Sequence, residues 1–267
     1  MTATVVAPQL GAANPLRRLG LIGLWGAPAT LIIVVTSALL RLATQFHGGE
    51  PVSSLPAEVE HAARMTHRLA ATGVGLLAAL ALVTAYRARP IAKALRVAVG
   101  AVVGLTLLLA VVGRYATGYG AMPIVALNVM GGTALACGFW FLKERAAAPD
   151  SPLALLPLAA LAGIVGISAV GAATSFARMH GDRAFGAMHL WLATLLAMLA
   201  VVAALRHRSC GLPAAATAVL VTAQYGMGFA LLATGRPLYL TLLHAAMSAL
   251  LALGLVSLAV RGGVVRR

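Results

Sequence analysis

Residues 239–260 read YLTLLHAAMSALLALGLVSLAV, and this stretch decides the fold. It holds no Asp, Glu, Lys or Arg, and His244 is its one strongly polar ring. A hydrocarbon core about 30 Å thick is crossed by roughly 20 apolar residues in a helix. Because lipid offers no hydrogen bonds to the backbone, such a stretch must close its own hydrogen bonds as a helix. The stretch therefore predicts a transmembrane helix with a histidine inside it.

Seven more stretches of this kind precede it. The eight expected spans are residues 20–40, 69–86, 97–112, 122–142, 153–173, 187–205, 212–232 and 239–260. Across its 267 residues the chain is 61% hydrophobic and 10% charged, which is too little polar surface to cover a soluble globule. The sequence predicts an all-α polytopic membrane protein of eight transmembrane helices, with membrane lipid as its main partner.

The basic residues are distributed unequally between the two faces that this topology creates, and the formal net charge is +14. The face with both chain ends holds Arg17, Arg18, Arg87, Arg89, Lys93, Arg96, Lys143, Arg145, Arg206, Arg208, Arg261, Arg266 and Arg267, and the other holds Arg41, Arg64, Arg68, Arg114, Arg178, Arg183 and Arg236. The positive-inside rule then places both termini in the cytoplasm, with the chain in a bacterial-type plasma membrane or an organelle inner membrane. Topology thus explains the charge, and we expect no nucleic-acid partner, since no basic helix or aromatic platform lies outside the spans.

Short sequence matches recur at helix ends and suggest an internal repeat. Residues 43–46 read ATQF and residues 173–176 read ATSF, while residues 67–72 read HRLAAT and residues 189–194 read HLWLAT. Repeated halves are a common way to build membrane proteins. We therefore expect two tandem four-helix-bundle repeats, residues 1–148 and residues 149–267.

The third and seventh spans extend this pattern. They end in ATG at residues 116–118 and 233–235, and each is followed by a proline that starts the next helix, where a missing amide proton is tolerated. Asn128 then occupies the place in the fourth span that His244 occupies in the eighth. The first external loop, residues 50–67, is longer than its counterpart, and we expect a solvated, partly helical segment there.

His189 and His244 lie at similar depths near the outer ends of the sixth and eighth spans. Ionisable side chains inside a membrane are costly and usually face a partner or a cofactor. Two histidines that we expect on neighbouring antiparallel helices could bind a haem iron as both axial ligands. Small residues that would make room for a flat macrocycle are Gly186, Ala187, Ala193, Gly226, Gly228, Ala245 and Ala246.

The outer arginines supply candidate partners for haem propionates. Arg178, Arg183 and Arg236 lie on the same face as the histidines, and guanidinium groups bind carboxylates in bidentate fashion. Three alternatives stay open: separate histidines satisfied by backbone carbonyls or water, loop arginines that are merely solvated, and a zinc site. Zinc is the weakest of these, because no HExxH motif or third ligand at that depth is present.

The ordered set of motifs resembles the haem A synthase family. The matching segments are residues 67–70 (HRLA), 123–128 (PIVALN), 188–189 (MH), 224–228 (QYGMG), Pro237 and 243–244 (LH). The resemblance spans nearly the whole chain. It implies eight helices in two haem-binding halves and the oxidation of haem O to haem A for cytochrome c oxidase assembly. It also implies that His189 and His244 hold a resident haem b and that His67 is a ligand, or catalytic residue, at the site for haem O.

Two positions depart from the family pattern and leave the N-terminal site degenerate. Asn128 stands where the family has its second N-terminal histidine, and Arg64 stands where family enzymes have a glutamate three residues before the first histidine. Glu58 or Glu60 could substitute for that glutamate only if the first external loop folded back. The alternative is therefore a non-catalytic b-type cytochrome or haem-binding subunit of a membrane electron-transfer complex, with other membrane subunits as partners. A transporter without haem is a third, weaker interpretation.

Overall fold

The computed structural model describes residues 15–47, 50–88, 91–116, 122–179 and 186–264. Its helices are α1 (Pro15–Leu42), α2 (Ala57–Arg87), α3 (Lys93–Ala116), α4 (Met122–Ala147), α5 (Leu155–Met179), α6 (Gly186–Arg206), α7 (Leu212–Ala233) and α8 (Leu238–Val264), with a short 3₁₀ turn, η1 (Arg208–Cys210). Within these ranges eight helices are long and apolar enough to cross a membrane. The prediction of an all-helical polytopic membrane protein is confirmed.

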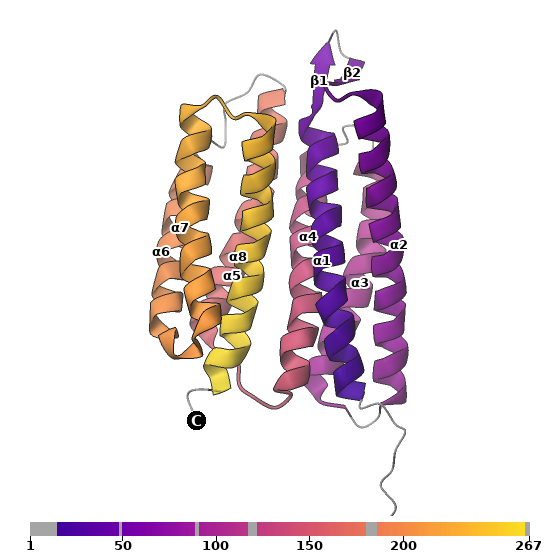
Figure 1. Ribbon diagram of the computed structural model, residues 1–267, viewed down its shortest axis with the longest axis vertical. Helices are drawn as coiled ribbons and strands as arrows, with labels where there is room; N and C mark the ends of the chain where they lie inside the picture. Colours follow the sequence, from indigo (N-terminus) through magenta and orange to yellow (C-terminus); the bar gives the residue numbers. More distant parts are fainter. Residues whose placement is uncertain (1–14, 48–49, 89–90, 117–121, 180–185, 265–267) are drawn as a thin grey trace, which may run out of the picture.

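The helices form two groups of four that stand side by side (Figure 1). In each group consecutive helices pack together and the first also packs against the fourth, so α2 faces α4, and α6 faces α8, across a diagonal. α4 and α8 join the groups, with further contacts from α1 and α5. The two groups coincide with the expected halves, whereas an origin by duplication stays a prediction.

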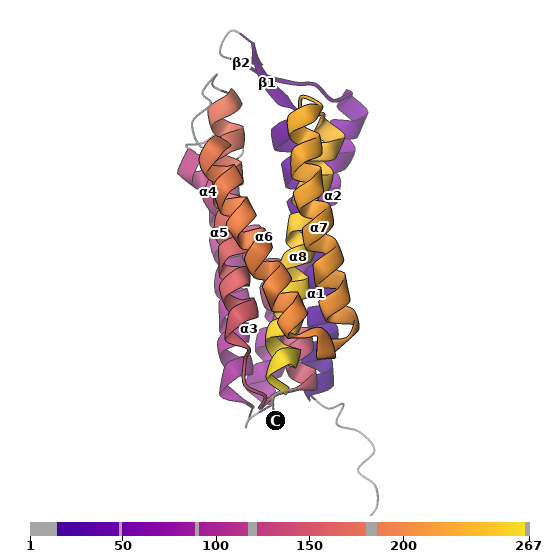
Figure 2. The ribbon, with the colours of Figure 1, turned by 90° about the vertical axis from the view of Figure 1, so that its left-hand side faces the viewer.

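The first external connection is solvated and partly helical, as expected, but it also contains a β-hairpin that the sequence did not predict. β1 (Thr44–His47) pairs with β2 (Glu50–Ser53) as an antiparallel hairpin at the end of the bundle opposite the end of α8 (Figures 1 and 2). α2 then begins at Ala57, well before the expected start at residue 69. Hydropathy missed these turns because they carry charges, but Ala, Glu and Arg favour helix, and the acidic first turn complements the helix dipole.

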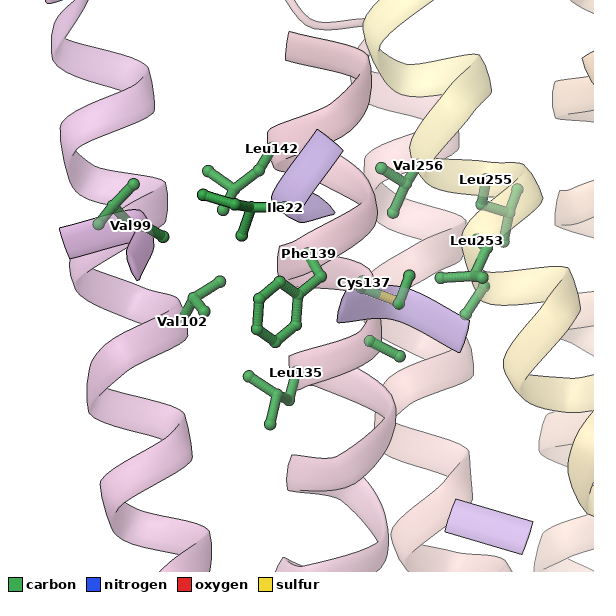
Figure 3. Packing of buried hydrophobic residues seen from close by; sticks show 14 of the residues in the cluster. Ile22, Val99, Val102, Leu135, Cys137, Phe139, Leu142, Leu253, Leu255 and Val256 are labelled. Carbon is green, nitrogen blue, oxygen red and sulfur yellow. The ribbon is translucent and has the colours of Figure 1, made fainter. Parts of the chain in front are cut away.

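The core lies along α1 and α4 and continues into α8. Phe139 is fully buried, and a Cβ at Gly26 of α1 would overlap its ring. Figure 3 shows Phe139 on the side of α4 that faces Val102 of α3, and Cys137 on the side toward Leu253 of α8. Apolar side chains such as Leu76 remain exposed on the outer surface, where lipid replaces a protein partner.

A buried polar cluster joins α4 to α8 at the end of the bundle away from the hairpin. Glu144 is 3% exposed, and it accepts hydrogen bonds from Arg261 Nε at 2.8 Å and from Ser257 Oγ at 3.1 Å. Lys143 Nζ lies 2.7 Å from the same carboxylate, and Trp140 Nε1 donates to Ser257 Oγ at 2.8 Å. Because a buried charge must be paired, this cluster fixes the two halves against each other.

Candidate haem-binding site

His189 and His244 lie in the first two turns of α6 and α8. These two helices begin at the hairpin end of the bundle (Figures 1 and 2). The expectation of neighbouring antiparallel helices was wrong: α6 and α8 run in the same direction and lie across the bundle diagonal. Neighbouring helix axes are roughly 8–10 Å apart, so a diagonal spans roughly 14 Å. The diagonal arrangement is better suited to a group sandwiched between two imidazoles than direct helix contact would be.

Each of these histidines has one imidazole nitrogen that is buried without a partner. The Nδ1 atoms of His189 and His244 are both shielded from solvent and have no hydrogen bond. An unsatisfied buried polar atom costs about 1–3 kcal/mol. Two such atoms at one end of one bundle make these two imidazoles candidates for binding a ligand.

The backbones of α5 and α7 come close to the two rings. A Cβ at Gly171 of α5 would lie 3.3 Å from Cε1 of His189, and a Cβ at Gly228 of α7 would lie 3.9 Å from Cε1 of His244. Gly171 was not among the candidates read from the sequence, because only the packing of α5 on α6 reveals its closeness to His189. The glycine at 171 thus leaves space that a side chain would take from the imidazole.

His244 has a polar neighbour on α7. Gln224 Nε2 lies 3.2 Å from His244 Nε2, while Gln224 Oε1 is buried without a partner. From the sequence, Gln224 was noted only as part of the QYGMG match, because its contact with His244 depends on how α7 packs on α8. The structure therefore adds a residue to the candidate site.

The packing of α6 and α8 is loose at the histidine end and tight at the other end. In α6 the buried residues are Ala200, Ala203 and Ala204, and in α8 they begin at Ala249. Nothing lies within 4 Å of a Cβ built on Gly186, and Gly226 is exposed on α7. The first turns of α6 and α8 are therefore packed less tightly than their last turns.

Arg236 lies between α7 and α8, close enough to interact electrostatically with both His189 and His244. The φ angle of Arg236 is 66°, and that of the preceding residue, Gly235, is 72°. The chain therefore has two residues in the left-handed region directly before Pro237. A non-glycine residue in this conformation costs of the order of 1–3 kcal/mol, and such strain clusters at functional sites. Arg183 lies outside the described residues, and so does the side chain of Arg178.

In the N-terminal half, the corresponding histidine, His67, has a hydrogen-bonding partner. His67 Nδ1 lies 3.3 Å from Thr36 Oγ1, which also donates to the carbonyl of Ile32 at 2.7 Å. Asn128 is half-buried on α4, across the diagonal from α2. Thus His67 has a protein partner, and the facing helix α4 contains no histidine.

The sequence left open that the first external loop folds back and brings Glu58 or Glu60 to His67. Glu58 and Glu60 belong to the first turn of α2, and Glu60 forms an ion pair with Arg64 one turn later. Glu60 precedes His67 by seven residues, which is roughly 10 Å along a helix. The fold-back that would supply a glutamate to His67 is therefore absent from this part of the structure.

The described residues contain no group of three or more His, Cys, Asp or Glu that could hold a metal ion. No protein-family model matches this chain, and none of the curated proteins matches its sequence. The site must therefore be interpreted from its own geometry.

Proposed function

We propose that this chain is a haem-binding integral membrane protein that resembles haem A synthase. In this proposal His189 of α6 and His244 of α8 would hold a haem b. The observation that carries it is the pair of unpartnered, buried Nδ1 atoms on facing diagonal helices. A ferrous or ferric iron between two neutral imidazoles would remove the cost of leaving these rings unsatisfied.

The surrounding residues fit such a group. Gly171 and Gly228 leave room beside the rings, and Arg236 places a guanidinium near both histidines, where it would bind a propionate. Arg183 remains a second candidate for a propionate, as proposed from the sequence. Apolar helices around the site exclude water from the macrocycle.

A haem held by two histidines would supply one-electron transfer. Chemistry on a second substrate such as haem O would then belong to the N-terminal half. There His67 would bind or orient that substrate, while His189 and His244 keep the resident haem in place.

The alternative function is a non-catalytic b-type cytochrome or a haem-binding subunit of a membrane electron-transfer complex. Three observations in the N-terminal half favour it: His67 is held by Thr36, Asn128 replaces a second histidine, and Arg64 pairs with Glu60. Under this alternative, His67→Ala leaves the cytochrome unchanged. Under the enzyme, the same substitution abolishes conversion of haem O to haem A.

The eight helices make the chain a multi-pass membrane protein in contact with lipid. We place the chain in a bacterial-type plasma membrane or an organelle inner membrane. Both termini would lie on the cytoplasmic side, or on the equivalent side of the organelle membrane, because that face carries the excess of basic residues. This orientation puts the haem near the outer surface. Other membrane subunits of a respiratory or oxidase-assembly complex would be its partners.

The test is a reduced-minus-oxidised absorption spectrum of the detergent-purified protein, with the extracted haem identified. We expect a b-type signal that is lost in both His189→Ala and His244→Ala. His61→Ala is the matched control, since His61 is exposed on α2. A wild-type protein that stays colourless after haem supplementation would contradict both haem functions, and haem A in the extract would select the enzyme.

A further inference from the structure

Gln224 and His244 form a polar contact between α7 and α8 within the apolar half-bundle. The amide nitrogen of Gln224 lies 3.2 Å from Nε2 of His244, so one edge of the imidazole is held while Nδ1 is buried and unpartnered. His189 has no amide partner of this kind in the part of the chain that the structure describes. The two proposed iron ligands are therefore supported unequally.

An imidazole that binds a metal through one nitrogen carries its proton on the other, and that proton is normally accepted by a neighbouring group. The carbonyl of Gln224 can serve as this acceptor, because the two ends of an amide have nearly the same shape and can exchange places by rotation. Its Oε1 atom is buried without a partner, so it has no competing hydrogen bond to lose.

We propose that Gln224 is a positioning residue for His244, setting the orientation and basicity of this iron ligand and thereby the retention and reduction potential of the haem. The inference rests on the proposed haem site. An acceptor on the imidazole N–H makes the ligand a better electron donor and favours the ferric state. Loss of this acceptor raises the reduction potential and weakens haem binding by about 10-fold or more, in the range seen for such supporting residues.

Tyr225, the next residue of α7, offers a matched control. Its hydroxyl lies 3.1 Å from Thr194 Oγ1 of α6, so Tyr225→Phe also removes one polar contact of α7 with another helix. This contact involves neither histidine. If haem retention or potential changes merely because an interhelical hydrogen bond is lost, Tyr225→Phe should therefore show the same change as Gln224→Leu.

The experiment compares Gln224→Leu, Gln224→Glu and Tyr225→Phe with the wild type, each checked for folding by gel filtration. We measure haem loss to a haem-scavenging protein, the midpoint potential and the electron paramagnetic resonance spectrum of the ferric haem. In Gln224→Leu, the rate of haem loss should rise about 10-fold. Its midpoint potential should be higher than that of the wild type, and its electron paramagnetic resonance spectrum should be shifted. Gln224→Glu should restore retention and lower the potential, because a carboxylate is a stronger acceptor.

Tyr225→Phe should match the wild type in all three measurements. If the wild type holds a bis-histidine haem but Gln224→Leu keeps its retention, potential and spectrum, the positioning role is wrong and the haem site stands. If the wild type binds no haem at all, the proposed function fails and the role of Gln224 fails with it.

Discussion

The two four-helix halves share one pattern of helix neighbours, yet they place their histidines in different surroundings. In the N-terminal half His67 is hydrogen-bonded to Thr36, and Asn128 occupies the facing helix. In the C-terminal half His189 and His244 both retain a buried nitrogen without a partner. The comparison teaches that the same bundle can either satisfy a histidine internally or leave one of its buried nitrogens without a partner.

The first helix of each half contributes to this difference. When the halves are aligned on residues 43–44 and 173–174, Thr36 corresponds to Gly166 and Arg41 corresponds to Gly171. Where the N-terminal half has two side chains that can form hydrogen bonds, the C-terminal half has two glycines. Of the two glycines, Gly171 leaves space beside His189 of α6, which the proposed macrocycle would need, whereas Gly166 is exposed on α5.

The largest expected effect comes from filling that space. Gly171→Leu puts a Cβ 3.3 Å from Cε1 of His189 and the rest of the side chain beyond it, so the imidazole must move and haem should be lost completely. Gly166→Leu is the control on the same helix, because nothing lies within 4 Å of its Cβ position. Haem content per polypeptide measures both. Equal haem in the two variants would show that Gly171 does not border the site.

A converse change should give the N-terminal half a second ligand. Asn128→His places an imidazole on α4, across the diagonal from His67, and we expect haem content to rise from about one to about two per polypeptide, as for a second bis-histidine site. Asn128→Gln is the control of similar polarity. If only one haem is bound in Asn128→His, the side chains around His67, rather than the missing ligand, keep this half empty.

The cluster that joins the halves tests whether they behave as one unit. Arg261→Leu leaves the Glu144 carboxylate, 3% exposed, with Lys143 and Ser257 alone, and we expect a loss of about 2 kcal/mol in the free energy of unfolding. Unfolding in SDS–detergent mixtures measures this loss. Arg206→Leu, an exposed arginine at the end of α6, should be neutral. Equal stabilities of the two variants would show that the halves do not depend on this cluster.

The smallest effect is expected at Thr36. Thr36→Val removes the partner of His67 Nδ1 while keeping the shape of the side chain, which should cost about 1 kcal/mol of stability. The b-type spectrum should stay unchanged, because the proposed haem site lies in the other half. Thr72→Val, on the exposed face of α2, is the control. A spectral change in Thr36→Val alone would indicate haem in the N-terminal half.

The sequence by itself determined the eight membrane spans, because the requirement for about 20 apolar residues is a property of each segment and needs no partner. It also indicated that His189 and His244 share a depth, since both follow the start of a helix at the same face. It did not determine the start of α2, where charged residues continue the helix beyond the hydrocarbon, nor the hairpin before it.

Only the tertiary structure decided which side chains meet. It placed α6 and α8 on a diagonal, brought Gln224 to His244 and Gly171 to His189, and paired Glu144 with Arg261 across 117 positions of the chain. The physical reason is that hydropathy is nearly uniform around these helices, so it fixes their length and depth but leaves their rotation and neighbours to packing.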